Sequence, residues 1–267
     1  MAPVLIAIGG AVDLAPPTPL QAFLEHAGGA EGRVVILPTA SSLDDAGQAY
    51  VAAFEALGLA QPARVLNVRR RDAAHDPATV EAIRQATGIF FTGGNQVRIT
   101  ATLGGTPVEA ALHAAYRRGA VIGGTSAGAA VLSRVMLAYG EDGPTPHQGM
   151  AQFVPGLGFT DRLIIDQHFR QRDRLGRLIY AVANNPGLLG VGIDENTAAV
   201  IDDAALTVLG AHAVTIVDGR ELQHTDVADA PAGAPVAVSG VRLHVLTAGC
   251  HFDLVRRQAQ IAERELG

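Results

Sequence analysis

The sequence predicts an α/β fold, with an open, mainly parallel sheet flanked by helices and extended at its C-terminal end by a β-meander. In the first part of the chain, apolar runs of about five residues alternate with longer segments of helical period, which is typical of βαβ units. After about residue 187, apolar runs follow one another with only turn residues between them, which indicates antiparallel strands. The 267 residues contain no linker-like tract, so we expect a single domain spanning 1–267.

The expected elements follow from these runs in chain order. Strands are predicted over 4–8, 34–37, 65–68, 88–91 and 121–123, and helices over 19–27, 44–57, 77–86 and 107–118. The meander strands are LLGVGID, TAAVID, LTVLG and AVTIVD, and we expect them to extend the sheet. The Ala-, Pro- and Gly-rich segment 224–240 predicts a surface excursion before a last strand over 241–246, and a terminal helix is expected over 254–265.

Composition excludes several classes of chemistry. All 20 basic residues are arginine, and the lack of lysine excludes Schiff-base catalysis, a Walker lysine and a Ser-Lys dyad. The single cysteine, Cys250, excludes an intramolecular disulfide and a multi-thiolate metal site. The histidines lack the HxxxH or HxH spacing of metal ligands, so we expect neither a metal nor another cofactor.

Net charge and hydropathy restrict the binding partners and the cellular location that we expect for this protein. A net charge of −6 gives no general attraction to phosphate backbones, so we expect no nucleic acid partner. Apolar runs are broken well before the ~18 residues of a membrane span, so no membrane partner is expected. The first residues, MAPVLIAIGGAV, lack the basic region of a signal peptide, and we therefore expect a cytoplasmic protein.

The segment GTSAG at 124–128 fits the pattern G-x-S-x-G, follows an apolar strand and precedes an Ala-rich helix start. This is the context of a nucleophile elbow, where small neighbours let the serine adopt a strained conformation with an exposed hydroxyl. Backbone N–H groups beside such a serine point at a developing oxyanion. Small, flexible glycine-serine loops are also common, so the motif alone leaves the role of Ser126 open.

A second glycine turn, FFTGGNQ at 90–96, also follows an apolar strand and precedes a helix. In a parallel sheet both turns lie at the carboxyl edge, where ligands bind. Gly93 and Gly94 could therefore bring a backbone N–H to the same reacting oxygen as Ala127. A plain strand-to-helix connection explains the turn equally well, and the G-x-G-x-x-G fingerprint of dinucleotide binding is absent.

The segment IIDQHFRQRDRLGRL at 164–178 places a histidine after an apolar strand, where a general base could point into a cleft. Four arginines follow His168: Arg170, Arg172, Arg174 and Arg177. Guanidinium groups so close together repel one another unless they meet carboxylates. Those carboxylates belong either to a substrate or to the chain itself, through Asp161, Asp166 or Asp173.

The segment GIDENTA at 192–198 ends another apolar strand. Either Asp194 or Glu195 could accept the Nδ1 proton of His168, which would fix its tautomer and stabilise the imidazolium. Acidic residues at strand ends are also common turn formers, so this segment has little meaning alone.

These motifs, in this order and spacing, resemble those of the cyanophycinases, a family of serine peptidases related to the α-aspartyl dipeptidases. The match runs over nearly the whole chain and includes LPTAS at 37–41, FFTGGNQ, GGTSAGAAVL, DQHF with its arginines, GIDE, and HVLTAG near the C-terminal end. The resemblance implies a sheet similar to that of the class I glutamine amidotransferases, which is a flavodoxin-like sandwich. It also implies a homodimer.

The resemblance further implies roles for individual residues. Ser126 would be the nucleophile, His168 the general base and Glu195 the acid that orients it. The N–H groups of Gly94 and Ala127 would form the oxyanion hole. The substrate pocket would contain Gln96, Asp166, Gln167, Arg172, Arg174 and Arg177. The chain order Ser, His, Glu differs from the Ser, acid, His order of the α/β-hydrolases, which argues against an ordinary esterase.

The substrate of the family is cyanophycin, a poly-aspartate backbone with arginine attached to each side-chain carboxyl group. The resemblance implies an exopeptidase that releases β-aspartyl-arginine dipeptides from the carboxyl end of the polymer. The arginines would hold substrate carboxylates, and Asp166 and Asp194 are candidates to receive the substrate guanidinium group. The alternatives are a related dipeptidase acting on another aspartyl peptide and a non-catalytic binder of acidic peptides, with a metal hydrolase ranked lower.

Overall fold

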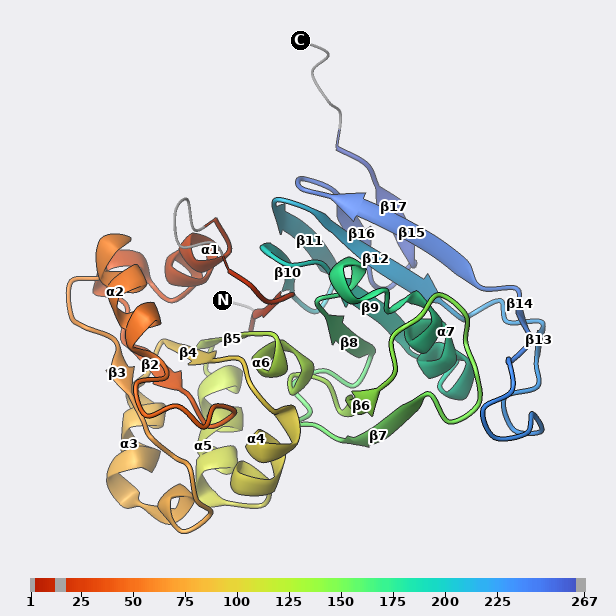
Figure 1. The fold of residues 1–267 in the computed structure, drawn as a ribbon. Coiled ribbons are helices and arrows are strands. Elements are labelled where there is room, and N and C mark those ends of the chain that lie inside the picture. Colours follow the sequence, from red (N-terminus) through yellow and green to blue (C-terminus); the bar gives the residue numbers. More distant parts are fainter. Residues whose placement is uncertain (1–2, 13–17, 263–267) are drawn as a thin grey trace.

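The computed structural model describes residues 3–12 and 18–262 (Figure 1). Within them, the main sheet has nine strands in the order β17-β16-β11-β10-β1-β5-β4-β2-β3, and a second sheet has four in the order β15-β12-β9-β8. Two short ladders, β13-β14 and β6-β7, complete the strands. The predicted class, an α/β fold built on a largely parallel sheet with an antiparallel extension, is confirmed. Among the helices described, none is long and apolar enough to cross a membrane.

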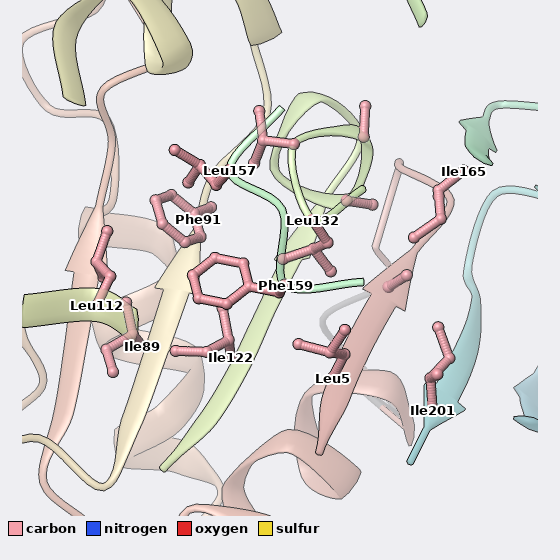
Figure 2. Packing of buried hydrophobic residues seen from close by; sticks show 14 of the residues in the cluster. Leu5, Ile89, Phe91, Leu112, Ile122, Leu132, Leu157, Phe159, Ile165 and Ile201 are labelled. Atoms are coloured by element: carbon pink, nitrogen blue, oxygen red, sulfur yellow. The ribbon is translucent and has the colours of Figure 1, made fainter. Parts of the chain in front are cut away.

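The parallel half of the main sheet is formed by β1 (Leu5–Ile8), β5 (Val121–Thr125), β4 (Gly88–Phe91), β2 (Val34–Leu37) and β3 (Arg64–Val65). Alternate residues of these strands enter two separate apolar clusters, so each face of the sheet is covered. Figure 2 shows Leu5, Ile89, Phe91 and Ile122 in one of them. Burial on both faces explains why the strands read as unbroken apolar runs.

Helices cover the two faces of this half as the sequence predicted. The cluster on one face includes residues of α1 (Thr18–His26) and α2 (Gln48–Ala56). The other face packs against α3 (Pro77–Gln85), α4 (Gln96–Leu103) and α5 (Pro107–Arg117). Sequence signals fix where these helices begin. The Asp76 carboxylate caps α3 by accepting the N–H groups of Ala78 and Thr79, and a proline opens both α3 and α5.

The β-meander divides between the two sheets, which corrects the expectation that all its strands extend one sheet. The strands β10 (Thr197–Ile201) and β11 (Ala205–Gly210) extend the main sheet beside β1, whereas β9 (Leu189–Ile193) and β12 (Ala213–Asp218) join β8 (Leu163–Gln167). Residues of all these strands share one apolar cluster, which the two sheets form by packing on each other. Helix α7 (Leu175–Asn184) packs against β9 and β12 of the second sheet.

The C-terminal part differs most from the prediction. The strand expected over 241–246 is β15 (Arg242–Thr247), but β16 (His251–Asp253) and β17 (Gln258–Gln260) follow it. The terminal helix over 254–265 is therefore wrong up to residue 262, and 263–267 lie outside the described residues. The reason is local, because the Asp253 carboxylate accepts the N–H groups of Val255 and Arg256 and closes a turn between β16 and β17.

Two other segments refine the prediction. The strand expected over 65–68 is only the two-residue β3. The excursion over 224–240 carries β13 (His224–Thr225) and β14 (Val238–Ser239) and packs on a hairpin that the sequence analysis did not predict, formed by β6 (Val135–Gly140) and β7 (Ala151–Pro155). The backbone N–H groups of Gln148 and Val236 connect the excursion to the loop of this hairpin, at 2.9 Å each.

The aromatic cluster beneath α1 and α2 gives a test of the core. Phe90 is fully buried in edge-on contact with Phe23 and Phe54. Replacing Phe90 by Ala should lower the free energy of unfolding by about 3–5 kcal/mol, because the transfer free energy is lost and a cavity remains. Denaturant titration would measure this. The control is Leu43→Ala, at a side chain with 65% exposure, which should change the free energy of unfolding by no more than about 0.5 kcal/mol. An equal loss of stability in the two variants would contradict the packing described.

Candidate active site

The turn that ends β5 holds Ser126 in a conformation that side chains rarely adopt. Its φ is 55° and its ψ is −115°, and α6 (Ala127–Ala130) begins at the next residue. The neighbouring glycines are required by space, because a Cβ on Gly124 would lie 2.6 Å from the backbone of Gly128, and one on Gly128 would lie 2.3 Å from the Phe91 carbonyl oxygen. The turn therefore has the strained geometry that the G-x-S-x-G motif predicts.

Three side chains from different strand ends meet at this turn. His168 directly follows β8 and also has a positive φ, of 49°. Its Nε2 lies 2.9 Å from Ser126 Oγ, and its Nδ1 lies 2.6 Å from Glu195 Oε1. We call this arrangement the Ser–His–Glu chain. Of the two carboxylates that the sequence left open, Glu195 contacts the imidazole, whereas Asp194 accepts the backbone N–H groups of Arg170 and Ala213.

The end of β1 anchors the backbone of all three segments. The carbonyl of Ile8 accepts the N–H of Ser126 at 2.9 Å, and the carbonyl of Gly9 accepts the N–H of His168 at 2.6 Å. The carbonyl of Gly10 accepts the N–H of Asn196, which follows Glu195, at 2.9 Å. Three consecutive carbonyls of one strand end thus set the positions of the three members of the Ser–His–Glu chain.

The surroundings of His168 favour its neutral form. Burial lowers the pKa of His168 below its ordinary value, and the guanidinium groups of Arg172 and Arg174 act in the same direction. The hydrogen bond to Glu195 opposes this shift by stabilising the imidazolium. A neutral imidazole with Nδ1–H donated to Glu195 leaves Nε2 free to accept the proton of the Ser126 hydroxyl.

Two backbone N–H groups near Ser126 have no acceptor among residues 3–12 and 18–262. Neither Gly94 nor Ala127 donates its N–H to any acceptor in the described part of the chain. The glycine turn comes close, since a Cβ on Gly93 would lie 3.4 Å from the Cβ of Ser126. Gly94 has φ of +140°, and a Cβ there would collide with the Ala40 carbonyl oxygen at 2.3 Å, so the turn accepts only glycine.

A cavity of about 320 Å³ opens beside Ser126. It is lined by Gly94, Asn95, Gln96, Ser126, Leu137, Ala138, Tyr139, Gly140, Gln167, Arg172, Arg174 and Arg177. The amide Nε2 of Gln96 donates to the carbonyls of Leu137 and Ala138, which ties α4 to β6 and leaves Oε1 without a partner among residues 3–12 and 18–262. The cavity is therefore formed by the two glycine turns, the β6 strand and the arginine-rich segment.

The four arginines after His168 differ in their partners. Arg177 contacts the Asp166 carboxylate through Nε, at 2.6 Å, and through Nη2. Arg174 binds Asp142 at 3.1 Å and the Gln167 side chain at 2.8 Å, and the exposed Arg170 lies 3.5 Å from Asp194. Within the described ranges, Arg172 alone among the four has no carboxylate partner. It is the guanidinium group available to a ligand in the cavity.

Two expectations for substrate contacts need correction. Asp166 has no exposed side-chain surface and does not line the cavity, because Arg174 and Arg177 surround it. The side chain of Asp194 is 5% exposed and engaged with the backbone, as described above. Neither carboxylate lines the cavity beside Ser126. The alternative that the arginines pair within the chain is correct for Arg174 and Arg177.

Sequence reasoning missed several residues of the site. The β6 strand contributes Tyr139 and Gly140 to the cavity, and Asp142 in the following loop holds Arg174. The side chain of Gln171 accepts the N–H of Glu195 at 3.1 Å. The apolar runs VMLAYG and AQFVP around a Gly- and Pro-containing loop carry a hairpin signal that would have indicated the β6-β7 wall.

Fold and geometry together define the class, which is a serine-type hydrolase built on an α/β sheet. The model of peptidase family S51 matches residues 5–209, and the chain belongs to that family. It is therefore a serine-type peptidase. No group of three or more His, Cys, Asp or Glu side chains that could hold a metal ion is found among the described residues.

Individual relatives agree with this assignment. The chain is 39% identical over 257 residues to a cyanophycinase from Nostoc sp., covering 95% of this chain and 86% of the relative. It is 38% identical to a cyanophycinase from Geminocystis herdmanii, covering 93% of each protein. A crystal structure of a peptidase from an acI-B1 Actinobacterium superposes with a TM-score of 0.64 at 22% identity, over 95% of this chain and 97% of that one, which shows the shared fold.

The electrostatics of His168 can be tested without an activity assay. Arg172→Gln should raise the pKa of His168, because the guanidinium of Arg172 disfavours the imidazolium. NMR titration of the imidazole would measure the change. Arg170→Gln is the matched control, since Arg170 pairs with Asp194 and is not among the groups that shift this pKa. An unchanged or lower pKa in Arg172→Gln would contradict the description.

Proposed function

We propose that this chain is an exopeptidase that hydrolyses backbone bonds of cyanophycin and releases β-aspartyl-arginine dipeptides through an acyl-enzyme on Ser126. The observation that carries the proposal is the Ser–His–Glu chain, which lies at a cavity containing the unpartnered guanidinium of Arg172. Identity of 39% to the Nostoc cyanophycinase supports the choice of substrate. The proposal treats residues 1–267 as one peptidase domain.

In the first half of the reaction, Ser126 Oγ attacks the carbonyl carbon of the scissile aspartyl bond. Nε2 of His168 takes the hydroxyl proton as the C–O bond forms, and Glu195 stabilises the imidazolium. The tetrahedral intermediate then collapses, the C–N bond breaks, and Nε2 returns the proton to the leaving nitrogen. The β-aspartyl-arginine unit departs with a free amine, and the shortened polymer remains as an ester on Ser126.

The negative oxygen of the intermediate needs hydrogen-bond donors that are already in place. The N–H groups of Gly94 and Ala127 are the donors we propose, because neither has an acceptor within the described part of the chain and each lies on one of the two turns around Ser126. In the second half of the reaction, His168 takes a proton from water, which attacks the ester. Ser126 leaves with that proton, and the polymer is released with a new carboxylate.

Recognition of the polymer end is the proposed role of Arg172. The terminal unit carries carboxylates at the backbone end and on the arginine arm, and a guanidinium fork binds such groups in a bidentate manner. Arg174 and Arg177 are held by Asp142 and Asp166 and set the shape and charge of the cavity wall. A cation that binds the terminal carboxylate would restrict cleavage to the chain end, as an exopeptidase requires.

The substrate guanidinium group needs a different partner from the one predicted. Tyr139 lines the cavity with 54% of its surface exposed and offers an aromatic face to a cation. The unpartnered Oε1 of Gln96 offers a neutral acceptor in the same cavity. We propose these two side chains in place of Asp166 and Asp194.

Location and assembly complete the proposal. We infer a cytoplasmic protein and a homodimer, as the sequence and its resemblance to the cyanophycinases suggest. Cell fractionation would test the location. Light scattering coupled to size-exclusion chromatography would test the dimer, and a mass of one chain, near 27.6 kDa, would contradict it.

The nucleophile is tested with the polymer itself. Ser126→Ala should leave the free energy of unfolding nearly unchanged and reduce release of β-aspartyl-arginine by about 10⁴-fold or more, because the acyl-enzyme cannot form. Mass spectrometry of soluble products from insoluble cyanophycin would measure release. Ser239→Ala, on an exposed strand, is the control. Activity retained by Ser126→Ala would end the proposal, and release from Asp-Xaa dipeptides alone would point to a different aspartyl peptide.

The role of Arg172 predicts a loss of binding rather than of chemistry. At a pH where His168 is neutral in both proteins, Arg172→Gln should raise KM by about ten- to a hundredfold, the worth of a charge-assisted hydrogen bond. The kcat should change far less. Steady-state kinetics on short cyanophycin segments would separate the two constants, with Arg170→Gln as control. A normal KM would show that the terminal carboxylate binds elsewhere.

A further inference from the structure

The imidazole of His168 lies directly against the backbone of Gly10. A Cβ on this residue would lie 2.1 Å from Cε1, 2.5 Å from Nε2 and 2.7 Å from Nδ1 of the ring. Contacts this short do not occur for real Cβ atoms, so any side chain at this position would displace the ring. Gly10 also has φ of +108°, a conformation that other residues rarely adopt.

The position of the His168 imidazole matters because each of its two nitrogen atoms contacts another member of the Ser–His–Glu chain. Nε2 and Nδ1 are at hydrogen-bond distance from Ser126 and Glu195, so a shift of the ring lengthens at least one of these contacts. The same glycine accepts the N–H of Asn196, which fixes the segment that carries Glu195. The Cα of Gly10 therefore packs against the imidazole of His168, and the carbonyl of Gly10 holds the main chain next to Glu195.

We propose that Gly10 is a positioning residue, whose missing side chain provides the surface on which the His168 imidazole rests between Ser126 and Glu195. This inference rests on the proposed function for its kinetic consequence. Its structural consequence, that Gly10 and the imidazole exclude any added methyl group, does not depend on the substrate. Gly10 takes no part in proton transfer and does not line the cavity.

The kinetic test uses Gly10→Ala. We expect kcat to fall about a hundredfold, the size of effect that a misplacement of about 1 Å produces, with little change in KM because Arg172 and Gln96 are untouched. The short contact of Nδ1 with Glu195 predicts a far-downfield NMR signal for the Nδ1 proton in the unmodified protein, and this signal should be absent in Gly10→Ala. Gly28→Ala is the matched control, since Gly28 has φ of +106° but its added Cβ would meet nothing closer than 3.7 Å. Normal kcat and an unchanged proton signal in Gly10→Ala would overturn the inference.

A double-mutant cycle keeps the test valid if Gly10→Ala unfolds the protein. Removing the ring with His168→Ala should reduce the stability loss caused by Gly10→Ala to that of Gly28→Ala, or restore folding where the single variant fails. An equal loss in both backgrounds would show that Gly10 matters only for its backbone conformation and would overturn the inference. Because stability is the readout, a protein inactive on cyanophycin would refute the proposed function and leave this result intact.

Discussion

The geometry of the site depends on the end of β1, where three successive carbonyl groups accept hydrogen bonds from three separate segments. β1 pairs with β5 on one side and β10 on the other, so its end lies at the centre of the main sheet. The carbonyls of Ile8, Gly9 and Gly10 hold the segments that carry Ser126, His168 and Glu195. Since His168 follows a strand of the second sheet, this strand end also joins the two sheets at the point where the chemistry takes place.

The convergence of these three segments requires strained backbone conformations and leaves space only for small residues at several positions. Ser126 and His168 both adopt positive φ, at a typical cost of about 1–3 kcal/mol each, and they persist because the surrounding hydrogen bonds and packing fix them. The His168 imidazole at Gly10 and the backbone atoms near Gly94 and Gly128 leave no room for a Cβ at these three positions. Burial and the nearby Arg172 lower the pKa of His168 and so favour its neutral form, while Glu195 orients the ring, so the same compact arrangement favours the protonation state that a general base needs.

Much of the fold and the site could be predicted from sequence because each signal was local. Apolar runs predicted the parallel strands, segments of helical period predicted the helices between them, and G-x-S-x-G marked the strained turn. Most of what failed depended on tertiary context. No local pattern tells that β9 and β12 leave the main sheet or that Asp166 is enclosed by Arg174 and Arg177. The turn at Asp253 is the exception, because its cause is local: the carboxylate accepts the N–H groups of Val255 and Arg256. The need for glycine at position 10 depends on where the His168 imidazole lies, which no local pattern predicts.

The most direct test of the account is the reaction of the folded protein with a fluorophosphonate, followed by peptide mapping with mass spectrometry. The account predicts modification at Ser126 alone, because within the described residues this hydroxyl alone combines a strained turn, the imidazole of His168 at 2.9 Å and backbone N–H donors without acceptors. The rate should fall as the pH drops through the lowered pKa of His168. Absence of labelling in the folded protein, or labelling at another serine, would contradict the central claim that the end of β1 assembles an activated serine.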